Sequence, residues 1–400
     1  MHGRVNMGSG SNLAGMLVTW IVTSIAALAA QPAVPLTRAI DIRSLSTEQA
    51  EQGLAVRLRG TVTFTGVPGS VFVQDETAGT FFRPIDLDPL RPGDVVEVVG
   101  HTRMGHYLPG IGFAHFRILD SGPLPPAVDA GYDDLISGHY HYQRIAIEGI
   151  ARSQSPLEGG RSLLRVAMGS RIVEVRMESG LDAANRLVDS RVRVEGLAAG
   201  SINSRRQLVQ PFLRVPDWTA IVVLEPGTPE EEVPRISASE LLTFRVPSRG
   251  NHRVRLNGVV TASTSKGLAF VRDEQTAFGI RFLPPTPVEV GDRIEVLGFP
   301  QLDRFSASVV DATLVVRQAA SPPAPVELSI PQLLEGLHDC DLVAVTAVVT
   351  DSFRVEGDVV LTLQDDKRAP QARVPAPSLE LAIGSLVRAA GICQVESSVE

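Results

Sequence analysis

The sequence predicts an all-β chain of tandem five-stranded barrels, and three observations support this. A β-branched run that ends in glycine recurs along the chain. The clear copies are 56–60, 145–149 and 254–258, and a looser copy is 343–347. Each is followed by a second glycine-terminated run, and these closing glycines lie roughly 90 to 100 residues apart, a domain length rather than a solenoid turn. The closing glycines are Gly100, Gly196, Gly298 and Gly391. Abundant Gly and Pro, 35 and 28 residues, suit strands joined by many turns.

The first element expected along the chain is an export signal over residues 1–30. Arg4 precedes an apolar run from Leu13 to Ala30, which ends in small residues before Gln31. A retained membrane anchor is the alternative, because the run approaches the roughly 20 residues that span a bilayer. In either case we expect the body of the protein outside the cytoplasm, in the periplasm.

Four modules are expected after the signal. Their predicted bounds are 38–121, 130–224, 235–318 and 327–400. In the first, the alternating segment 56–64 and the short run 71–75 are predicted strands separated by a Pro-Gly turn. The fourth is expected to be incomplete, because too few residues follow Gly391 for a fifth strand. Short capping helices are expected before the barrels, as at 44–48 and 237–242, where Ser precedes an acidic residue.

The residues of the first module resemble a known family. Its segments 56–63, 71–79 and 93–100 look like the OB-fold repeats in periplasmic sensor regions of bacterial hybrid sensor histidine kinases. The resemblance covers residues 38–400 and implies tandem OB-fold barrels ahead of a transmembrane helix and a kinase. No catalytic residue carries over, because nothing in the sequence resembles the kinase's phosphoacceptor helix or its ATP-binding glycine boxes. A nucleophile with a base partner, a phosphate loop and a Cys/His cluster are not evident either.

This resemblance implies a non-catalytic sensory ectodomain that needs no cofactor. Its partner would be a small molecule, a glycan or a periplasmic protein, with membrane attachment through a later segment and homodimerisation left open. Two alternatives are a nucleic-acid-binding accessory region of a secreted nuclease and a structural spacer. The net charge of -8 disfavours phosphate binding by the whole surface, so nucleic acid is not the expected partner, although a local basic groove stays open.

Aromatic and arginine side chains on the second and third strands would form the ligand platform of such barrels. Core positions are the simpler interpretation of the phenylalanines, because they alternate with apolar neighbours. The candidates are Phe72, Phe81, Phe82 and Arg83 in the first module, and Phe270, Phe278, Arg281 and Phe282 in the third.

Two further residue pairs have structural interpretations. Cys340 and Cys393 flank the first and fourth strands of the fourth module, which would be antiparallel neighbours, so they form a candidate disulfide. Asp75 and Asp273 begin duplicated acidic turns, and we interpret their carboxylates as acceptors of backbone N–H groups rather than as catalysts.

A pair of histidines is the remaining candidate for chemistry. His139 and His141 would share one face of an extended segment, as two ligands of a metal ion would. No third ligand can be named from the sequence, and surface or inter-module packing is the simpler interpretation. The sequence therefore predicts no metal site.

Overall fold

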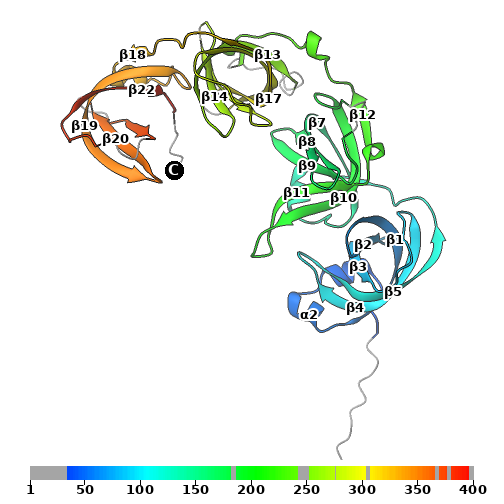
Figure 1. Ribbon diagram of the computed structural model, residues 1–400. Helices are drawn as coiled ribbons and strands as arrows, with labels where there is room; N and C mark the ends of the chain where they lie inside the picture. Colours follow the sequence, from blue (N-terminus) through cyan, green and yellow to red (C-terminus); the bar gives the residue numbers. More distant parts are fainter. Residues whose placement is uncertain are drawn as a thin grey trace, which may run out of the picture.

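The computed structural model describes residues 34–181, 186–241, 252–274, 276–302, 307–364, 369–375 and 380–395. Within these residues four β modules follow one another along a curved path, from blue to red in Figure 1, which confirms the predicted all-β array. The expected export signal over 1–30 lies outside the described residues. In the described part of the chain no helix has the length and apolar character needed to span a bilayer.

Module 1 is a closed barrel whose strands pair in the order β1-β2-β3-β5-β4. The strands are β1 (Ala55–Val67), β2 (Ser70–Gln74), β3 (Gly79–Pro84), β4 (Asp94–Met104) and β5 (Pro109–Ser121). β3 and β5 run parallel, and the other neighbours are antiparallel, which is the OB-fold topology. The helices α1 (Ala39–Arg43) and α2 (Thr47–Glu51) precede the barrel.

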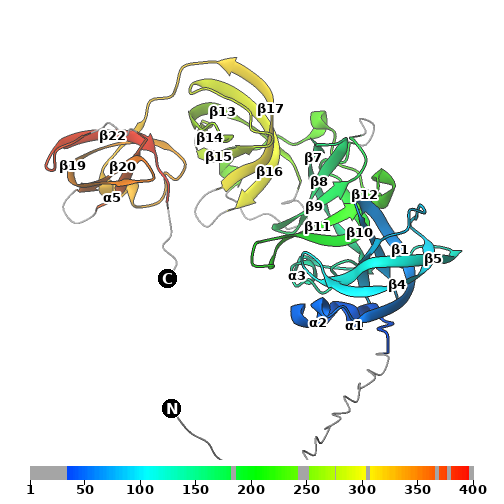
Figure 2. The same cartoon turned by 60° about the horizontal axis from the view of Figure 1, so that its bottom comes forward.

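Module 3 repeats this order as a second closed barrel, β13-β14-β15-β17-β16. Its elements are α4 (Ala238–Leu241), β13 (Val254–Ser263), β14 (Leu268–Arg272), β15 (Ala277–Phe282), β16 (Asp292–Leu302) and β17 (Ala307–Ala319). Figure 2 shows this barrel between its two neighbours.

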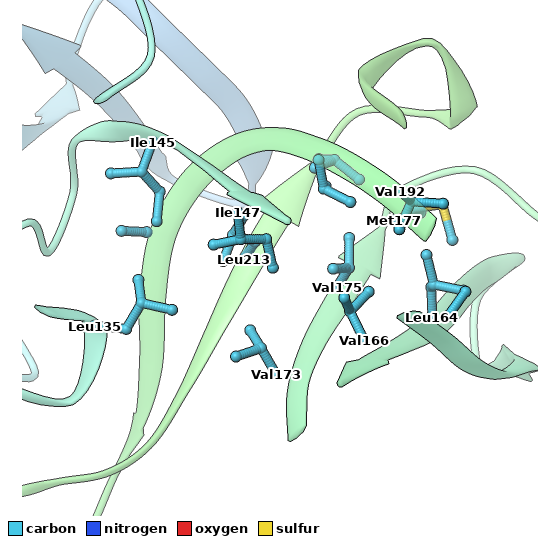
Figure 3. Close-up of a cluster of buried hydrophobic side chains, with 14 of the residues drawn as sticks. Leu135, Ile145, Ile147, Leu164, Val166, Val173, Val175, Met177, Val192 and Leu213 are labelled. Atoms are coloured by element: carbon cyan, nitrogen blue, oxygen red, sulfur yellow. The ribbon is translucent and has the colours of Figure 1, made fainter. Parts of the chain in front are cut away.

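Module 2 forms the same ring of five strands within a larger sheet. The pairing of β10 with β7 closes the ring, and the short strands β6 and β12 add to it. Its elements are β6 (Val128–Asp129), α3 (Tyr132–Ile136), β7 (Arg144–Leu157), β8 (Arg161–Met168), β9 (Arg171–Met177), β10 (Arg191–Ile202), β11 (Leu208–Val215), η1 (Trp218–Ala220) and β12 (Ile221–Glu225), followed by η2 (Glu230–Glu232). Figure 3 shows its separate core, in which Val175, Val192 and Leu213 are fully buried.

Module 4 is an open sheet. Its elements are β18 (Val326–Leu328), α5 (Ile330–Leu333), β19 (Leu342–Val355), β20 (Asp358–Gln364), β21 (Gln371–Val374) and β22 (Leu386–Ile392). β22 pairs with β19, as the fourth strand pairs with the first in the other modules. In those modules the fifth strand lies between the third and fourth strands in the sheet. The described residues of module 4 have no strand at that place, between β21 and β22. This agrees with the predicted incomplete copy.

The recurring first glycine is required by barrel closure. A Cβ atom at Gly60, Gly149 or Gly258 would lie 2.9, 2.3 or 2.6 Å from a carbonyl oxygen of the second strand. These separations are shorter than van der Waals contact allows, so only glycine lets the first strand curl so closely across the second. The repeat in the sequence therefore records one steric demand made in three barrels.

The duplicated acidic turns hold the capping helices in place. Asp75 Oδ2 accepts a hydrogen bond from the Ala39 backbone N–H at 2.8 Å, and Asp273 Oδ2 accepts one from Ala238 at 2.8 Å. The other carboxylate oxygen of each accepts N–H groups within its own turn, as interpreted from the sequence. One helix is expected at 44–48, but the structure has two helices on either side of Ser44–Ser46. α1 ends at Arg43, and the capping box of Ser46 starts α2 at Thr47.

Candidate nucleic-acid interface

The outer face of β2 and β3 in module 1 carries an aromatic pair that the next module covers. Phe72 and Phe81 lie opposite each other across the two strands. The ring of Tyr142, from module 2, lies 5.2 Å from the ring of Phe72 and 5.6 Å from that of Phe81. Only 7% of Phe72 and 6% of Phe81 remain exposed. Tyr142 thus occupies the place where a ligand ring would stack.

The same junction recurs between modules 3 and 4 with different side chains. Cys340 takes the position of Tyr142, and their φ angles are positive, 64° and 68°. Tyr142 donates its backbone N–H to Ala198 on β10, and Cys340 donates its own to Cys393, the residue after β22, both at 2.8 Å. The Arg272 guanidinium at the end of β14 donates to Asp341 and to the Leu342 carbonyl. Phe270 is buried, and its partner Gly279 on β15 lies next to module 4, because a Cβ there would be 4.0 Å from the Cys340 Sγ atom.

The predicted site residues therefore do not form an accessible platform. Phe82, Phe278 and Phe282 point into barrel cores, and Phe72, Phe81 and Phe270 lie on outer faces closed at module junctions. The two arginines, Arg83 and Arg281, are exposed. The core interpretation therefore holds for Phe82, Phe278 and Phe282. Phe72 and Phe81 are not accessible to a ligand because this face of the first barrel packs against the next module.

The junction between modules 2 and 3 is built differently. Arg165, on the outer face of β8, forms an ion pair with Asp311 on β17. The buried Asp189 carboxylate accepts the Arg253 backbone N–H at 2.9 Å and lies 3.1 Å from the His252 Nδ1 atom. Asp189 has a φ of +75° where modules 1, 3 and 4 have glycine. Module 3 thus contacts module 2 through the Asp311 region of its fifth strand and through His252 and Arg253 before its first strand.

The two cysteines are buried and are not joined by a disulfide in the structure. Their backbones are nevertheless adjacent, because Cys393 accepts the Cys340 N–H and donates to the Asp341 carbonyl. Burial and the nearby carboxylates of Asp339 and Asp341 raise the pKa of the Cys393 thiol to about 11. The bridge stays a prediction.

The two histidines lie in different environments. His141 is buried between the rings of Tyr107 and Tyr142, at 4.8 and 4.3 Å, and burial followed by the charge of Arg43 lowers its pKa to about 3. His139 is exposed. The described residues contain no group of three or more His, Cys, Asp or Glu side chains able to hold a metal ion. The packing interpretation is supported for His141.

One aromatic side chain in module 1 is open to solvent. Phe113 sits in β5 at a bulge opposite β4, has a φ of +46° and is 68% exposed. Asp311 holds the matching place in β17, with a φ of +49°. Aspartate tolerates the left-handed region, whereas a bulky residue there costs roughly 1–3 kcal/mol. Phe113 is therefore an outlier in both backbone and exposure.

Two arginines lie near Phe113 on the outer face of β3, β5 and β4. The Arg103 guanidinium lies 5.3 Å from the ring centroid, within cation–π range. Arg103 reaches it across Gly112, where a Cβ would meet the Arg103 Cδ atom at 3.0 Å. Arg83 on β3 lies beside this bulge, because Phe82 pairs with Ile111 and Pro84 with Ala114. We call Phe113, Arg103 and Arg83 the bulge platform.

The basic face continues onto β1. Arg57 and Arg117 share the single carboxylate of Glu97, at 3.1 and 3.5 Å, and Arg59 is exposed beside them. The hydrogen bond from Arg57 is the main cause of the lowered pKa of Glu97. A second carboxylate, Asp86, lies beside His115 at 3.0 Å. The arginines of this face still outnumber these two carboxylates, although the whole chain is acidic. This site could not be recognised in the sequence, because the bulge that exposes Phe113 is not visible in the alternation of residues. The matching residues are Phe113-Ala114 in module 1 and Asp311-Ala312 in module 3.

No protein-family model matches the chain, and no curated protein matches it. Similar solved structures include a murine DNA-binding protein bound to double-stranded DNA, with 13% identity, a TM-score of 0.25, and coverage of 44% of this chain and 98% of that one. Another is fission yeast Pot1 with single-stranded DNA, with 11% identity, a TM-score of 0.25, and coverage of 49% and 89%. A Streptococcus pneumoniae multidomain protein with nucleic-acid-binding domains has 9% identity, a TM-score of 0.13, and coverage of 70% and 78%.

These findings correct two expectations drawn from the resemblance. The three similar structures are described by their binding of DNA or by their nucleic-acid-binding domains, and their likeness to this chain concerns the fold. The expected sensory ectodomain is therefore not carried forward, and nucleic acid is no longer set aside as a partner. The geometry gives a physical reason for part of the correction. The barrel faces expected to hold a small ligand are closed at the junctions, whereas a basic face with one aromatic ring stays open.

Proposed function

We propose that this chain binds nucleic acid through the bulge platform of module 1. The observation that carries the proposal is the exposed Phe113 ring with the Arg103 guanidinium against it, on a face whose cations outnumber its carboxylates. A base can stack on such a ring, and arginines beside it can bind the phosphates on either side. The overall charge of -8 disfavours phosphate binding by the rest of the surface, so we place the attraction on this face.

The test is a fluorescence polarisation titration of the whole chain with a labelled oligonucleotide at low salt. Replacing Phe113→Ala removes the ring, and loss of one stacked base costs about 1–3 kcal/mol, so affinity is expected to fall roughly 5- to 150-fold. Asp311→Ala changes the matching bulge in module 3 and is expected to leave affinity unchanged. Absence of binding by the native chain at micromolar concentration, or equal losses in both variants, would overturn the proposal.

A further inference from the structure

The β10–β11 hairpin of module 2 reaches the loop that ends the bulge platform. The Arg206 Nη2 atom donates to the Gly105 carbonyl oxygen at 2.8 Å, and Gly105 follows Arg103 by two residues. The hairpin turn is itself well ordered by hydrogen bonds, because Asn203 Oδ1 accepts the backbone N–H groups of Arg205 and Gln207 at 3.0 and 2.9 Å. Arg205 is exposed at this turn.

The junction fixes the hairpin relative to the platform. Phe81 lies two residues before Arg83 on β3, and its ring packs against both Tyr142 of module 2 and the position of Gly110, where a Cβ would meet it at 2.4 Å. Tyr142 in turn donates its N–H to Ala198 on β10, the strand that leads into the hairpin. Packed contacts therefore connect the platform to the hairpin without a flexible linker.

The distance between the two features suits a short stretch of extended strand. His101 pairs with Gly112, beside Phe113, and Gly105 lies four residues further along the chain. At roughly 3.4 Å per residue this is about 14 Å. One barrel of this fold covers on the order of 4 to 16 nucleotides of single strand, so a single strand stacked on Phe113 would reach the hairpin.

From this arrangement we infer that the ligand is single-stranded nucleic acid and that its site spans modules 1 and 2, with Phe113 stacking a base and Arg205 and Arg206 binding phosphates. The inference rests on the proposed function and adds the strand class and the second module. Unpaired bases are required because the faces of paired bases are stacked inside a duplex and cannot lie on an aromatic ring.

The test uses the whole chain, a labelled oligodeoxythymidine and a series of salt concentrations. Each phosphate contact to a single strand contributes roughly 0.7 to the slope of log affinity against log salt. Arg205→Gln is expected to lower affinity several-fold and to reduce that slope by about 0.7. Phe113→Ala is expected to lower affinity with the slope unchanged, because stacking releases no counterions.

A matched control is Arg161→Gln, which neutralises an exposed arginine at the start of β8, following the β7–β8 turn of the same module. It is expected to change neither affinity nor slope. Unlabelled single strand should displace the probe at far lower concentration than a duplex of the same length. If Phe113→Ala weakens binding but Arg205→Gln behaves as Arg161→Gln does, or if duplex competes equally, the inference fails while the proposed function stands. If the native chain does not bind, both fail.

Discussion

Module 1 presents two aromatic surfaces that differ in what covers them. On the β2–β3 face, Phe72 and Phe81 are closed by Tyr142 and retain less than a tenth of their exposure. On the β3–β5–β4 face, Phe113 keeps 68% of its exposure and has a cation as its neighbour. In an array of barrels, the face that a single barrel would offer to a ligand becomes the joint between neighbours.

Module 3 shows what the second surface does when a neighbour reaches it. There the bulge residue is Asp311, which pairs with Arg165 of module 2. In module 1 the bulge carries Phe113, and its exposure shows that no described module covers it. The same bulge therefore contacts a neighbouring module in module 3 and is open to solvent in module 1, and the residue at the bulge differs between them.

The largest expected effect comes from protonating His141, which is buried at the junction of modules 1 and 2. The pKa of buried His141 is lowered from 6.5 to about 3, so between these pH values the unfolded chain binds a proton that the folded chain excludes. The contribution of His141 to the unfolding free energy is therefore fully present above pH 6.5. It falls by about 1.4 kcal/mol per pH unit below that value, which is about 3 kcal/mol at pH 4.5.

Urea unfolding, followed by Trp218 fluorescence in module 2, would measure this loss. His141→Gln should remove this part of the pH dependence, because the variant has no group to protonate there. His139→Gln alters an exposed neighbour and should keep the native pH profile. Identical profiles for the native chain and the His141 variant would contradict the assignment.

Removing the ring that closes the junction is expected to have the next largest effect. Tyr142→Ala deletes a half-buried ring that contacts Phe72 and Phe81, so the unfolding free energy should fall by about 2 kcal/mol. Phe113→Ala removes an exposed ring from the same barrel and should change it by less than about 0.5 kcal/mol. Calorimetric unfolding that shifts equally for the two variants would show that the two surfaces do not differ as described.

The barrels could be predicted from the sequence because each repeated residue meets a structural requirement within a single module. The glycines of the first strands answer a steric requirement inside one barrel, and Asp75 and Asp273 answer hydrogen-bonding requirements inside one turn. Such requirements leave the same residue type at the same place in each copy. Pattern and spacing were therefore sufficient for the fold.

The site could not be predicted in the same way, because it depends on what lies between copies. Nothing in the alternation around Phe72 and Phe81 tells an outer face covered by Tyr142 from one open to solvent. Phe82 and Phe81 are adjacent in sequence, yet one is a core residue of the barrel and the other belongs to a joint. Burial at a module boundary is set by residues some 60 or more positions away, which local periodicity does not report.

The smallest expected effect uses a matched pair of arginines. Arg83 and Arg281 hold the same position on the third strands of modules 1 and 3, and both are exposed. Arg83 lies beside Phe113, whereas Arg281 lies beside Asp311, which offers no ring and pairs with Arg165 of module 2. Arg83→Gln should therefore weaken oligonucleotide binding a few-fold and lower the salt slope by about 0.7, whereas Arg281→Gln should leave both unchanged. Polarisation titrations of both variants over a range of salt concentrations would decide this, and an equal loss in the two would mean that the strand follows a feature common to both barrels instead of the exposed ring.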